Sequence, residues 1–138
     1  MNARWLFKTE PGTYAFSDLE REGKTVWSGI RNYQARNYLR EVRPGDEILI
    51  YHTGGEKRVI GLAKALAPAY PETTPDGPDW VQIDIEAGER LPNPVPLPRL
   101  KGDPKLADLA LFKNGRLSVI PITANQFAQI LAHAQKPS

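Results

Sequence analysis

The sequence predicts an α+β domain built around a small mixed β-barrel with flanking helices. Short segments with strand-like patterns are interspersed with a few helical ones, and the regular strand–helix alternation of a parallel α/β fold is missing. A chain of 138 residues is about the size of one ordinary domain and can bury one continuous core. No internal repeat or linker is visible, so we expect a single domain over residues 1–138.

Two helices are predicted in the first third of the chain, after a first strand at residues 4–9. Ser17 and Glu20 stand three positions apart, the spacing of a capping box, and predict a short helix that ends near Gly23. Residues 32–42 predict a second helix, because apolar residues recur at i, i+4 and i+7 beside a row of arginines. This helix therefore has a core face and a basic edge.

The rest of the chain predicts further strands and a last helix. The strand segments are bounded by turn residues, and they are residues 47–52, 59–66, 80–86 and 117–120. The first two of these are expected to form a hairpin. The proline-rich residues 68–78 and 92–98 are expected to be extended loops. Thr123 and Gln126 form a second capping box, before a C-terminal amphipathic helix.

Composition excludes several classes of protein. Hydrophobic residues make up 41% and charged residues 25%, and no stretch approaches the roughly 20 apolar residues that span a bilayer. The first residues lack the apolar core of a secretion signal, so we expect a mature, soluble, cytoplasmic protein that does not bind membranes. The absence of cysteine excludes disulfides and thiolate chemistry, and two histidines are too few for a histidine-based metal site. We expect no cofactor.

Positive charge is concentrated in the first half of the chain. Residues 1–69 hold 11 Lys or Arg against 8 Asp or Glu, whereas residues 70–138 hold 7 against 8. Four arginines and one glutamate lie within residues 31–43. An anionic partner is expected to dock there. The modest net charge of +2 limits a nucleic-acid complex to a few phosphate contacts.

Residues 26–40, VWSGIRNYQARNYLR, gather many flat and hydrogen-bonding side chains. Trp27 is expected in a loop between two helices, where binding groups often collect. An indole stacks on any nucleobase, which is worth about 1–3 kcal/mol per base, while Ser and Asn side chains can read the polar edge of the base. The alternative is that Trp27 is a core residue, that Tyr33 and Tyr38 are packing residues and that the arginines are a solvated face. From composition alone this alternative is slightly favoured.

Six motifs, in the same order, resemble those of EVE domains. They are WLFKTEP (5–11), YAFSDL (14–19), TVWSGIRNYQARN (25–37), GDEILIYH (45–52), VIGLA (59–63) and WVQID (80–84). The resemblance runs nearly end to end. EVE domains belong to the PUA-like superfamily, with YTH and ASCH domains as relatives, and are regarded as readers of modified bases in nucleic acids. The resemblance thus implies a PUA-like mixed β-barrel with flanking helices and a pocket for one flipped-out base.

The resemblance also implies roles for particular residues. Trp27 would be the wall that stacks on the base and Ser28 would hydrogen-bond the edge of the base, similar to the aromatic-plus-serine step of a YTH pocket. Arg36, Arg40 and Arg43 would contact phosphates. The remaining base-binding candidates lie beside that step or at strand ends, and they are Lys8, Thr9, Glu10, Arg31, Asn32, Tyr51, His52 and Thr53.

Some of these roles have equally ordinary structural alternatives. Asn32 opens a helix and is as readily a simple cap. Thr53 stands where the family often has serine. Trp80 is expected to be a packed residue rather than a second wall of the pocket. Because extruding a base costs a few kcal/mol, we expect the partner to be single-stranded nucleic acid or a flipped modified base.

Two other functions compete with base recognition. Some ASCH relatives are small amidohydrolases, and Lys8, Thr9 and Glu10 offer a nucleophile, a base and a carboxylate for a reaction on modified nucleosides. Alternate residues of a strand face opposite ways, so Thr9 cannot share a face with the other two unless the strand has ended. We therefore expect a binding module and no catalytic residues. The third function is a protein-interaction adaptor, and a base reader of this size would itself work through an unidentified protein partner.

Overall fold

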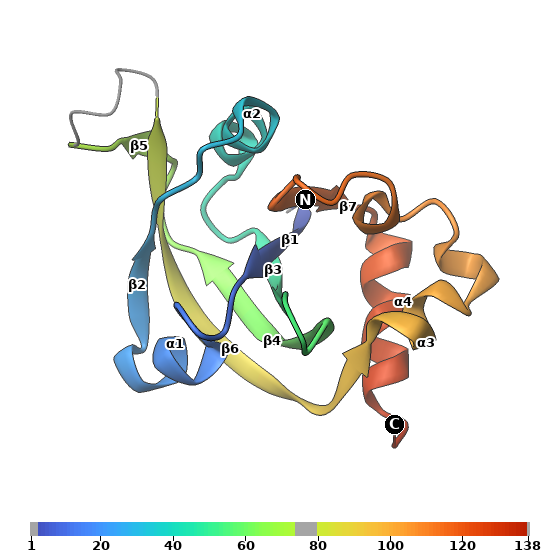
Figure 1. Cartoon of the computed structure of the whole chain (residues 1–138). Helices are drawn as coiled ribbons and strands as arrows, with labels where there is room; N and C mark the ends of the chain where they lie inside the picture. The colour runs from blue at the N-terminus through green and yellow to red at the C-terminus, as the bar shows by residue number, and fades with distance from the viewer. Residues whose placement is uncertain (1–2, 74–79, 138) are drawn as a thin grey trace.

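A mixed sheet lies at the centre of the protein, and helices pack around it (Figure 1). The computed structural model describes residues 3–73 and 80–137. Within them the strands are β1 (Arg4–Thr9), β2 (Lys24–Trp27), β3 (Glu47–His52), β4 (Arg58–Ala65), β5 (Tyr70–Pro71), β6 (Val81–Pro96) and β7 (Val119–Ile122). The helices are α1 (Phe16–Glu22), α2 (Tyr33–Glu41), α3 (Leu97–Lys101) and α4 (Ala124–Ala134), with two 3-10 turns, η1 (Pro104–Leu106) and η2 (Ala110–Phe112).

The sheet confirms the α+β class. The strand order is β2-β6-β4-β3-β1-β7, with β5 paired to β6. The β1 and β3 strands run parallel, and the other pairs are antiparallel. Among the described residues no pairing joins β2 to β7, the two ends of the order. The predicted closure into a barrel is therefore not found, because each of these short end strands uses its pairing edge on a single neighbour.

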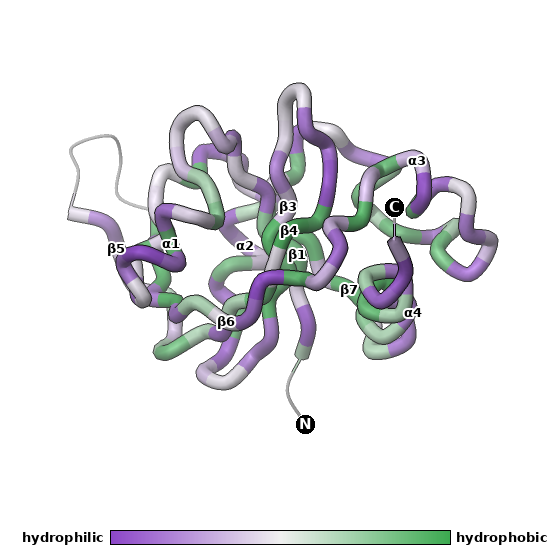
Figure 2. The backbone as a smooth tube through the Cα atoms, turned by 90° about the horizontal axis from the view of Figure 1, so that it is seen from below, coloured by the Kyte–Doolittle hydropathy of each residue, from purple (hydrophilic) through white to green (hydrophobic). Residues whose placement is uncertain are grey.

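The core includes the two parallel strands, β1 and β3. Leu6 and Phe7 of β1 are fully buried, as are Ile48 and Leu49 of β3. Asp46, immediately before β3, is also buried, and its carboxylate accepts hydrogen bonds from the backbone N–H of Ala3 and Arg43 and from the Trp5 indole. Figure 2 shows hydrophobic segments concentrated where these strands cross the middle of the molecule. The start of β1 is thus fixed against the turn that precedes β3.

The longest strand, β6, includes residues 92–96 of the predicted loop 92–98, and the last two residues of that loop begin α3, so the loop prediction is wrong. The prolines occupy alternate positions, so their missing N–H groups all lie along one edge of the strand. The side chains of Leu91 and Val95 are buried, and just beyond the strand the N–H of Leu97 donates to the carbonyl of Lys57 at 2.8 Å. The other predicted loop, 68–78, contains β5, and its residues 74–78 lie outside the described part of the chain.

Capping decides where the helices begin. The predicted cap of α1 is wrong, because Asp18 rather than Ser17 supplies the contact, accepting from the N–H of Ala15 at 2.8 Å, and the helix starts at Phe16. The predicted second helix and the Thr123 capping box are confirmed. No helix in residues 3–73 and 80–137 is long and apolar enough to cross a membrane.

Two strand predictions also need correction. Trp27 is the last residue of β2 rather than a loop residue, because residues 24–27 pair antiparallel with β6. The last strand begins at Val119, two residues later than predicted.

The start of the first helix packs closely against the sheet. Phe16 is buried over Gly61 of β4, where an added Cβ would lie 2.3 Å from the Phe16 ring. The N–H of Phe16 also donates to Nε2 of His52 at 3.0 Å. These contacts fix the turn between β1 and α1, which carries three residues of the site described next.

Candidate functional site

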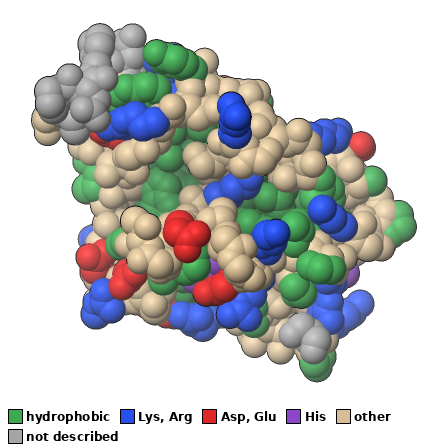
Figure 3. Space-filling view, in the orientation of Figure 1, with side chains coloured by type: hydrophobic (Ala, Val, Ile, Leu, Met, Phe, Trp, Pro, Cys, Tyr) green, Lys and Arg blue, Asp and Glu red, His purple; other side chains and the backbone are tan. Residues whose placement is uncertain are grey.

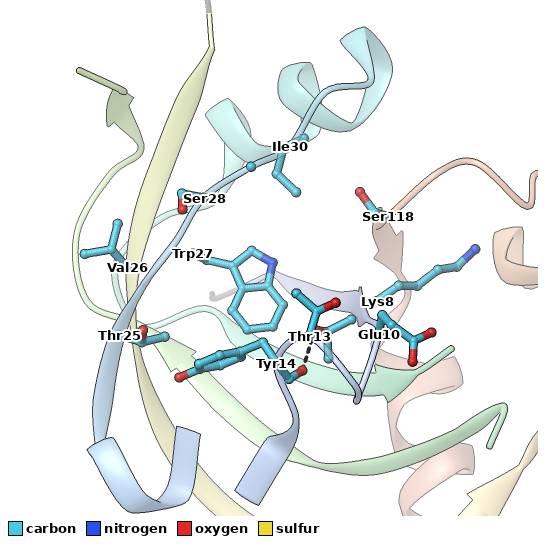
Figure 4. Close-up of a pocket in the computed structure, with 12 residues that line it drawn as sticks. Lys8, Glu10, Thr13, Tyr14, Thr25, Val26, Trp27, Ser28, Ile30 and Ser118 are labelled. Carbon is cyan, nitrogen blue, oxygen red and sulfur yellow. Dashed lines mark hydrogen bonds between the residues drawn. The ribbon is translucent and has the colours of Figure 1, made fainter. Parts of the chain in front are cut away.

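A cavity of about 450 Å³ opens where β1 and β2 end (Figure 4). Its lining comes from four separate segments, which are residues 8–10, 13–14, 25–30 and Ser118. Ligand pockets for small molecules typically have about 300–1,000 Å³. The cavity is therefore large enough for a planar heterocycle, and it mixes aromatic surface with hydroxyl, amine and carboxylate groups.

Trp27 lines this cavity from the end of β2. Its ring contacts Phe7 and Tyr14, each with ring centroids 5.8 Å apart, and the Tyr14 ring stands at 85° to it. Trp27 is 7% exposed. Figure 4 shows its indole nitrogen on the side of the cavity where Thr13 and Lys8 lie.

The indole N–H of Trp27 has no acceptor among the described residues, and it is not sealed from solvent. Trp5 provides the contrast, because it is 3% exposed and its N–H donates to Asp46 at 2.9 Å. Buried indole N–H groups usually find a partner. The donor of Trp27 is thus available to a molecule in the cavity.

The end of β1 forms another side of the cavity. The hydroxyl of Thr9 donates to the carbonyl of Tyr14 at 2.7 Å, the dashed line in Figure 4, and so holds the turn before α1. The ammonium of Lys8 lies 3.4 Å from the carbonyl of Gly115, and partial burial lowers the pKa of this lysine. The exposed carboxylate of Glu10 accepts from the N–H of Gly12 at 3.2 Å.

The segment after Trp27 is fixed from outside the cavity. Ser28 and Gly29 line the cavity and are exposed. The N–H of Gly29 donates to Glu72 at 3.0 Å, and Arg31 makes two hydrogen bonds of 2.8 and 3.2 Å to the same carboxylate. Arg31 does not line the cavity but lies over the Trp80 ring, 5.2 Å from its centroid.

Several of the predicted base contacts have structural partners instead. Asn32 caps α2, accepting from the N–H of Ala35 at 2.9 Å. His52 is 5% exposed, accepts from Phe16 through Nε2, and lies 2.9 Å from Glu56 through Nδ1. Tyr51 and Thr53 line a second, smaller pocket.

The predicted phosphate contacts lie away from the cavity. Arg36 hydrogen-bonds to Asn37 and lies over the Tyr33 ring at 5.0 Å. Arg40 and Arg43 line a different hollow, beside Pro68. Trp80, considered as a second wall, stacks on Tyr33 with centroids 5.0 Å apart and is not part of the cavity lining.

The sequence matches the EVE domain family over residues 3–133. The chain belongs to this family. Thymocyte nuclear protein 1 of Homo sapiens is 31% identical over 171 residues, covering 99% of this chain and 76% of the human one.

Solved structures share the fold of this EVE domain. Human THYN1 protein in complex with 5-methylcytosine-containing DNA has a TM-score of 0.89 and 29% identity, over 99% of this chain and all (100%) of that one. Protein PSPTO5229 from Pseudomonas syringae has a TM-score of 0.89 and 39% identity, over 96% and 99%. An ASCH protein from Zymomonas mobilis, at 15% identity and a TM-score of 0.57 over 95% and 94%, shares the fold alone.

The cavity of this EVE domain includes residues that the sequence did not single out for a role. They are Thr13, Tyr14, Thr25, Val26, Gly29, Ile30 and Ser118. Tyr14 carried a usable signal, as an aromatic residue inside a recognised motif. The hydroxyl of Tyr14 hydrogen-bonds to Glu22, and burial first, then this bond, raises its pKa. Ser118 carried no signal, because more than 80 residues separate it from the other lining segments.

Proposed function

We propose that this EVE domain binds nucleic acid and takes one modified base into the cavity beside Trp27. The observation that carries the proposal is the buried indole whose N–H faces the cavity without a partner among the described residues. The human THYN1 complex with 5-methylcytosine-containing DNA, similar over almost the whole chain, supports the same class of ligand. Five of the predicted base contacts line this cavity, and they are Lys8, Thr9, Glu10, Trp27 and Ser28.

The roles of these residues follow from their surroundings. Trp27 offers its ring and an N–H donor to the base, and the exposed Ser28 offers a hydroxyl to an edge of the base. Thr9 has a structural role, because its hydroxyl already donates to the carbonyl of Tyr14. Arg31 and Asn32 do not contact the base themselves, and they support the site by fixing residues 28–32. We also infer that the open sheet corresponds to the PUA-like barrel of the family.

The strength of base recognition depends on the walls of the cavity. Burying one added methyl group is worth about 0.8 kcal/mol, or roughly fourfold in affinity, so hydrophobic gain alone discriminates weakly. An unmodified base that leaves a buried polar group unpaired loses a further 1–3 kcal/mol or so. Extrusion of the base from a duplex costs a few kcal/mol. We therefore expect single-stranded or distorted sites to bind best.

A binding role is favoured over hydrolysis by the arrangement of Lys8, Thr9 and Glu10. Although all three line the cavity, no hydrogen bond joins any two of them in the described part of the chain. A nucleophile needs its base within hydrogen-bond reach. An acylated nucleoside incubated with the protein should therefore remain intact by chromatography, and turnover that Thr9→Ala abolishes would favour the amidohydrolase.

The test of base recognition uses two single-stranded oligodeoxynucleotides that differ by one 5-methylcytosine. The wild type should bind the methylated strand more tightly, and Trp27→Ala should lose that preference together with about 5- to 150-fold in affinity, as expected for one lost stacking contact. Fluorescence anisotropy of labelled strands gives both affinities. Trp80→Phe, which changes a tryptophan outside the cavity, is the control and should keep the preference.

Loss of folding must be separated from loss of binding. Trp27 packs on Phe7 and Tyr14, so its truncation to alanine also destabilises the core by about 3–5 kcal/mol. Trp27→Phe keeps most of this packing and removes the indole N–H, and it should fold cooperatively yet bind the methylated strand more weakly. Unchanged affinity in both Trp27 variants would contradict the proposal.

A further inference from the structure

A second pocket of about 240 Å³ adjoins the cavity, and Lys8 lines both. It lies between the β3–β4 turn, α3 and the segment from η2 to Gly115. Three of its lining residues are lysines, namely Lys8, Lys57 and Lys101. The remaining surface is partly apolar and includes Tyr51 and Phe112. The pocket is thus lined by three lysines together with apolar side chains.

Within the described part of the chain, the lysines of this pocket are not held in ion pairs. Neither Lys57 nor Lys101 forms an ion pair with any residue that the structure describes. Glu10, an acid that lines the adjoining cavity, is folded against Gly54, where an added Cβ would lie 2.6 Å from its Oε2. Its carboxylate accepts from the N–H of Gly12 and, at 3.4 Å, from the hydroxyl of Thr53. The acid is therefore engaged with backbone and hydroxyl donors.

The backbone at Lys57 is strained. Its φ is 46°, the left-handed region that favours glycine, and no other non-glycine residue in residues 3–73 and 80–137 has a positive φ. Its carbonyl is held by the N–H of Leu97 at 2.8 Å. Glycine would suit this conformation better, so the turn gives no structural reason for a lysine. Strained residues of this kind concentrate at functional sites.

We propose that this lysine pocket binds the phosphate of the nucleotide next to the base held beside Trp27. The inference rests on the proposed function, since it assigns the second pocket to the same nucleic-acid strand. Lys8 lies between the two sites, and Figure 3 shows Lys and Arg side chains around and between hydrophobic hollows at the centre of this face. Ammonium groups bind phosphate as point charges, and Phe112 offers apolar surface to the attached sugar or base.

This path differs from the one that the arginines of α2 and of the turn after it suggest. Arg36 lies over Tyr33, while Arg40 and Arg43 line a hollow beside Pro68. None of these three lines the cavity or the lysine pocket. The bound nucleic-acid strand would therefore run from the cavity past Lys8 toward α3 instead of crossing α2.

The experiment compares binding of two single-stranded trideoxynucleotides, identical except for a 5-methyl group on the central cytosine. The double variant Lys57→Gly/Lys101→Ala should bind both about tenfold more weakly, with the ratio of the two affinities unchanged. The slope of log affinity against log salt concentration should fall in magnitude by about 0.7, because the contact to one phosphate of a single strand is lost. Lys57→Arg/Lys101→Arg should bind like the wild type.

Matched controls separate this inference from the proposed function. Lys64→Ala removes an exposed lysine of β4 that lines neither pocket, and Arg40→Ala tests the path across α2. If the double variant behaves like Lys64→Ala, or if Arg40→Ala alone lowers the salt slope, the lysine pocket does not bind phosphate. If the wild type binds both trinucleotides equally, the proposed base recognition fails, while the lysine variants still report on phosphate through the salt slope.

Discussion

Lys57 combines a positive φ of 46° with an exposed side chain at the turn between β3 and β4. The left-handed conformation costs a non-glycine residue roughly 1–2 kcal/mol, whereas glycine loses about 0.5–1 kcal/mol more conformational entropy on folding. The difference favours glycine by about 0.5–1 kcal/mol. Because lysine at position 57 makes the protein less stable than glycine would, we expect the lysine side chain to serve binding.

Lys57→Gly should therefore stabilise the protein while it weakens nucleic-acid binding. The free energy of unfolding should rise by about 0.5–1 kcal/mol, measured by urea denaturation with an unchanged m-value. Lys64→Gly, the same substitution within β4, should instead lower it by a similar amount. A destabilised Lys57→Gly would show that the lysine contributes packing or hydrogen bonds of its own.

Trp5 and Trp27 show what separates a structural from a functional residue at this scale. Both are almost fully buried, at 3% and 7% exposure, so burial does not distinguish them. The distinction is the partner of the indole N–H, which is Asp46 for Trp5 and is missing for Trp27 among the described residues. No local pattern in the sequence contains this information, since Asp46 is 41 residues from Trp5.

At the scale of elements, α1 and β4 meet where Phe16 covers Gly61. An alanine at position 61 would place its Cβ 2.3–2.6 Å from the ring, so the ring and the start of α1 would have to move. Overpacking of this kind typically costs about 1–3 kcal/mol. Because only Ala15 separates Tyr14 from α1, the displacement would also reach the cavity.

Gly61→Ala should thus lower the free energy of unfolding by about 1–3 kcal/mol and weaken binding of the methylated strand. Gly55→Ala is the matched control, since nothing lies within 4 Å of its added Cβ. The double variant Phe16→Leu/Gly61→Ala should be less destabilised than the sum of its single changes, because the smaller side chain relieves the clash. Strict additivity in chemical denaturation would contradict this account of the contact.

The elements that the sequence predicted are those whose signals are local. The first strand and the helix capped by Thr123 depend on spacing and capping within a few residues, and both are confirmed. β2 was missed because its four residues become a strand only by pairing with β6, about 60 residues away. The prolines of residues 92–96 were misread for a related reason, since their single-edge placement matters only once β4 is in position.

At the scale of the whole molecule, the cavity was only partly predictable. Trp27, Ser28 and Lys8 were recognised from motifs, and the structure brings them together. Tyr51 and His52 end β3, which runs parallel to β1. Tyr51 lines the lysine pocket, whereas His52 is buried in the core. Strand alternation and the packing of α1 decide those directions, and both depend on contacts far apart in the sequence.

Besides its buried apolar side chains and the hydrogen bonds from Asn93 and Arg99, the C-terminal helix is held by the carboxylate of Asp103. Asp103, just before η1, accepts from Gln129 of α4 at 2.7 Å, lies 2.7 Å from Nε2 of His133, and accepts from the N–H of Lys105 at 2.9 Å. The hydrogen bond to His133 contributes most to lowering the pKa of Asp103 from 3.8 to about 2, followed by those from Gln129 and Lys105. The ionised form is therefore favoured by folding.

Acid should weaken this attachment over a defined range. Because the pKa of Asp103 is lower in the folded than in the unfolded chain, its contribution to stability is complete above about pH 4 and is lost as the pH falls toward 2. Other carboxylates with lowered pKa, including Asp18 and Glu56, act in the same direction, so the test is a difference between variants. Urea midpoints measured from pH 7 to pH 2 should fall less steeply below pH 4 in Asp103→Asn than in the wild type. Asp108→Asn, whose carboxylate is almost fully exposed, should follow the wild-type curve, and equal acid slopes in Asp103→Asn and wild type would rule out the attachment.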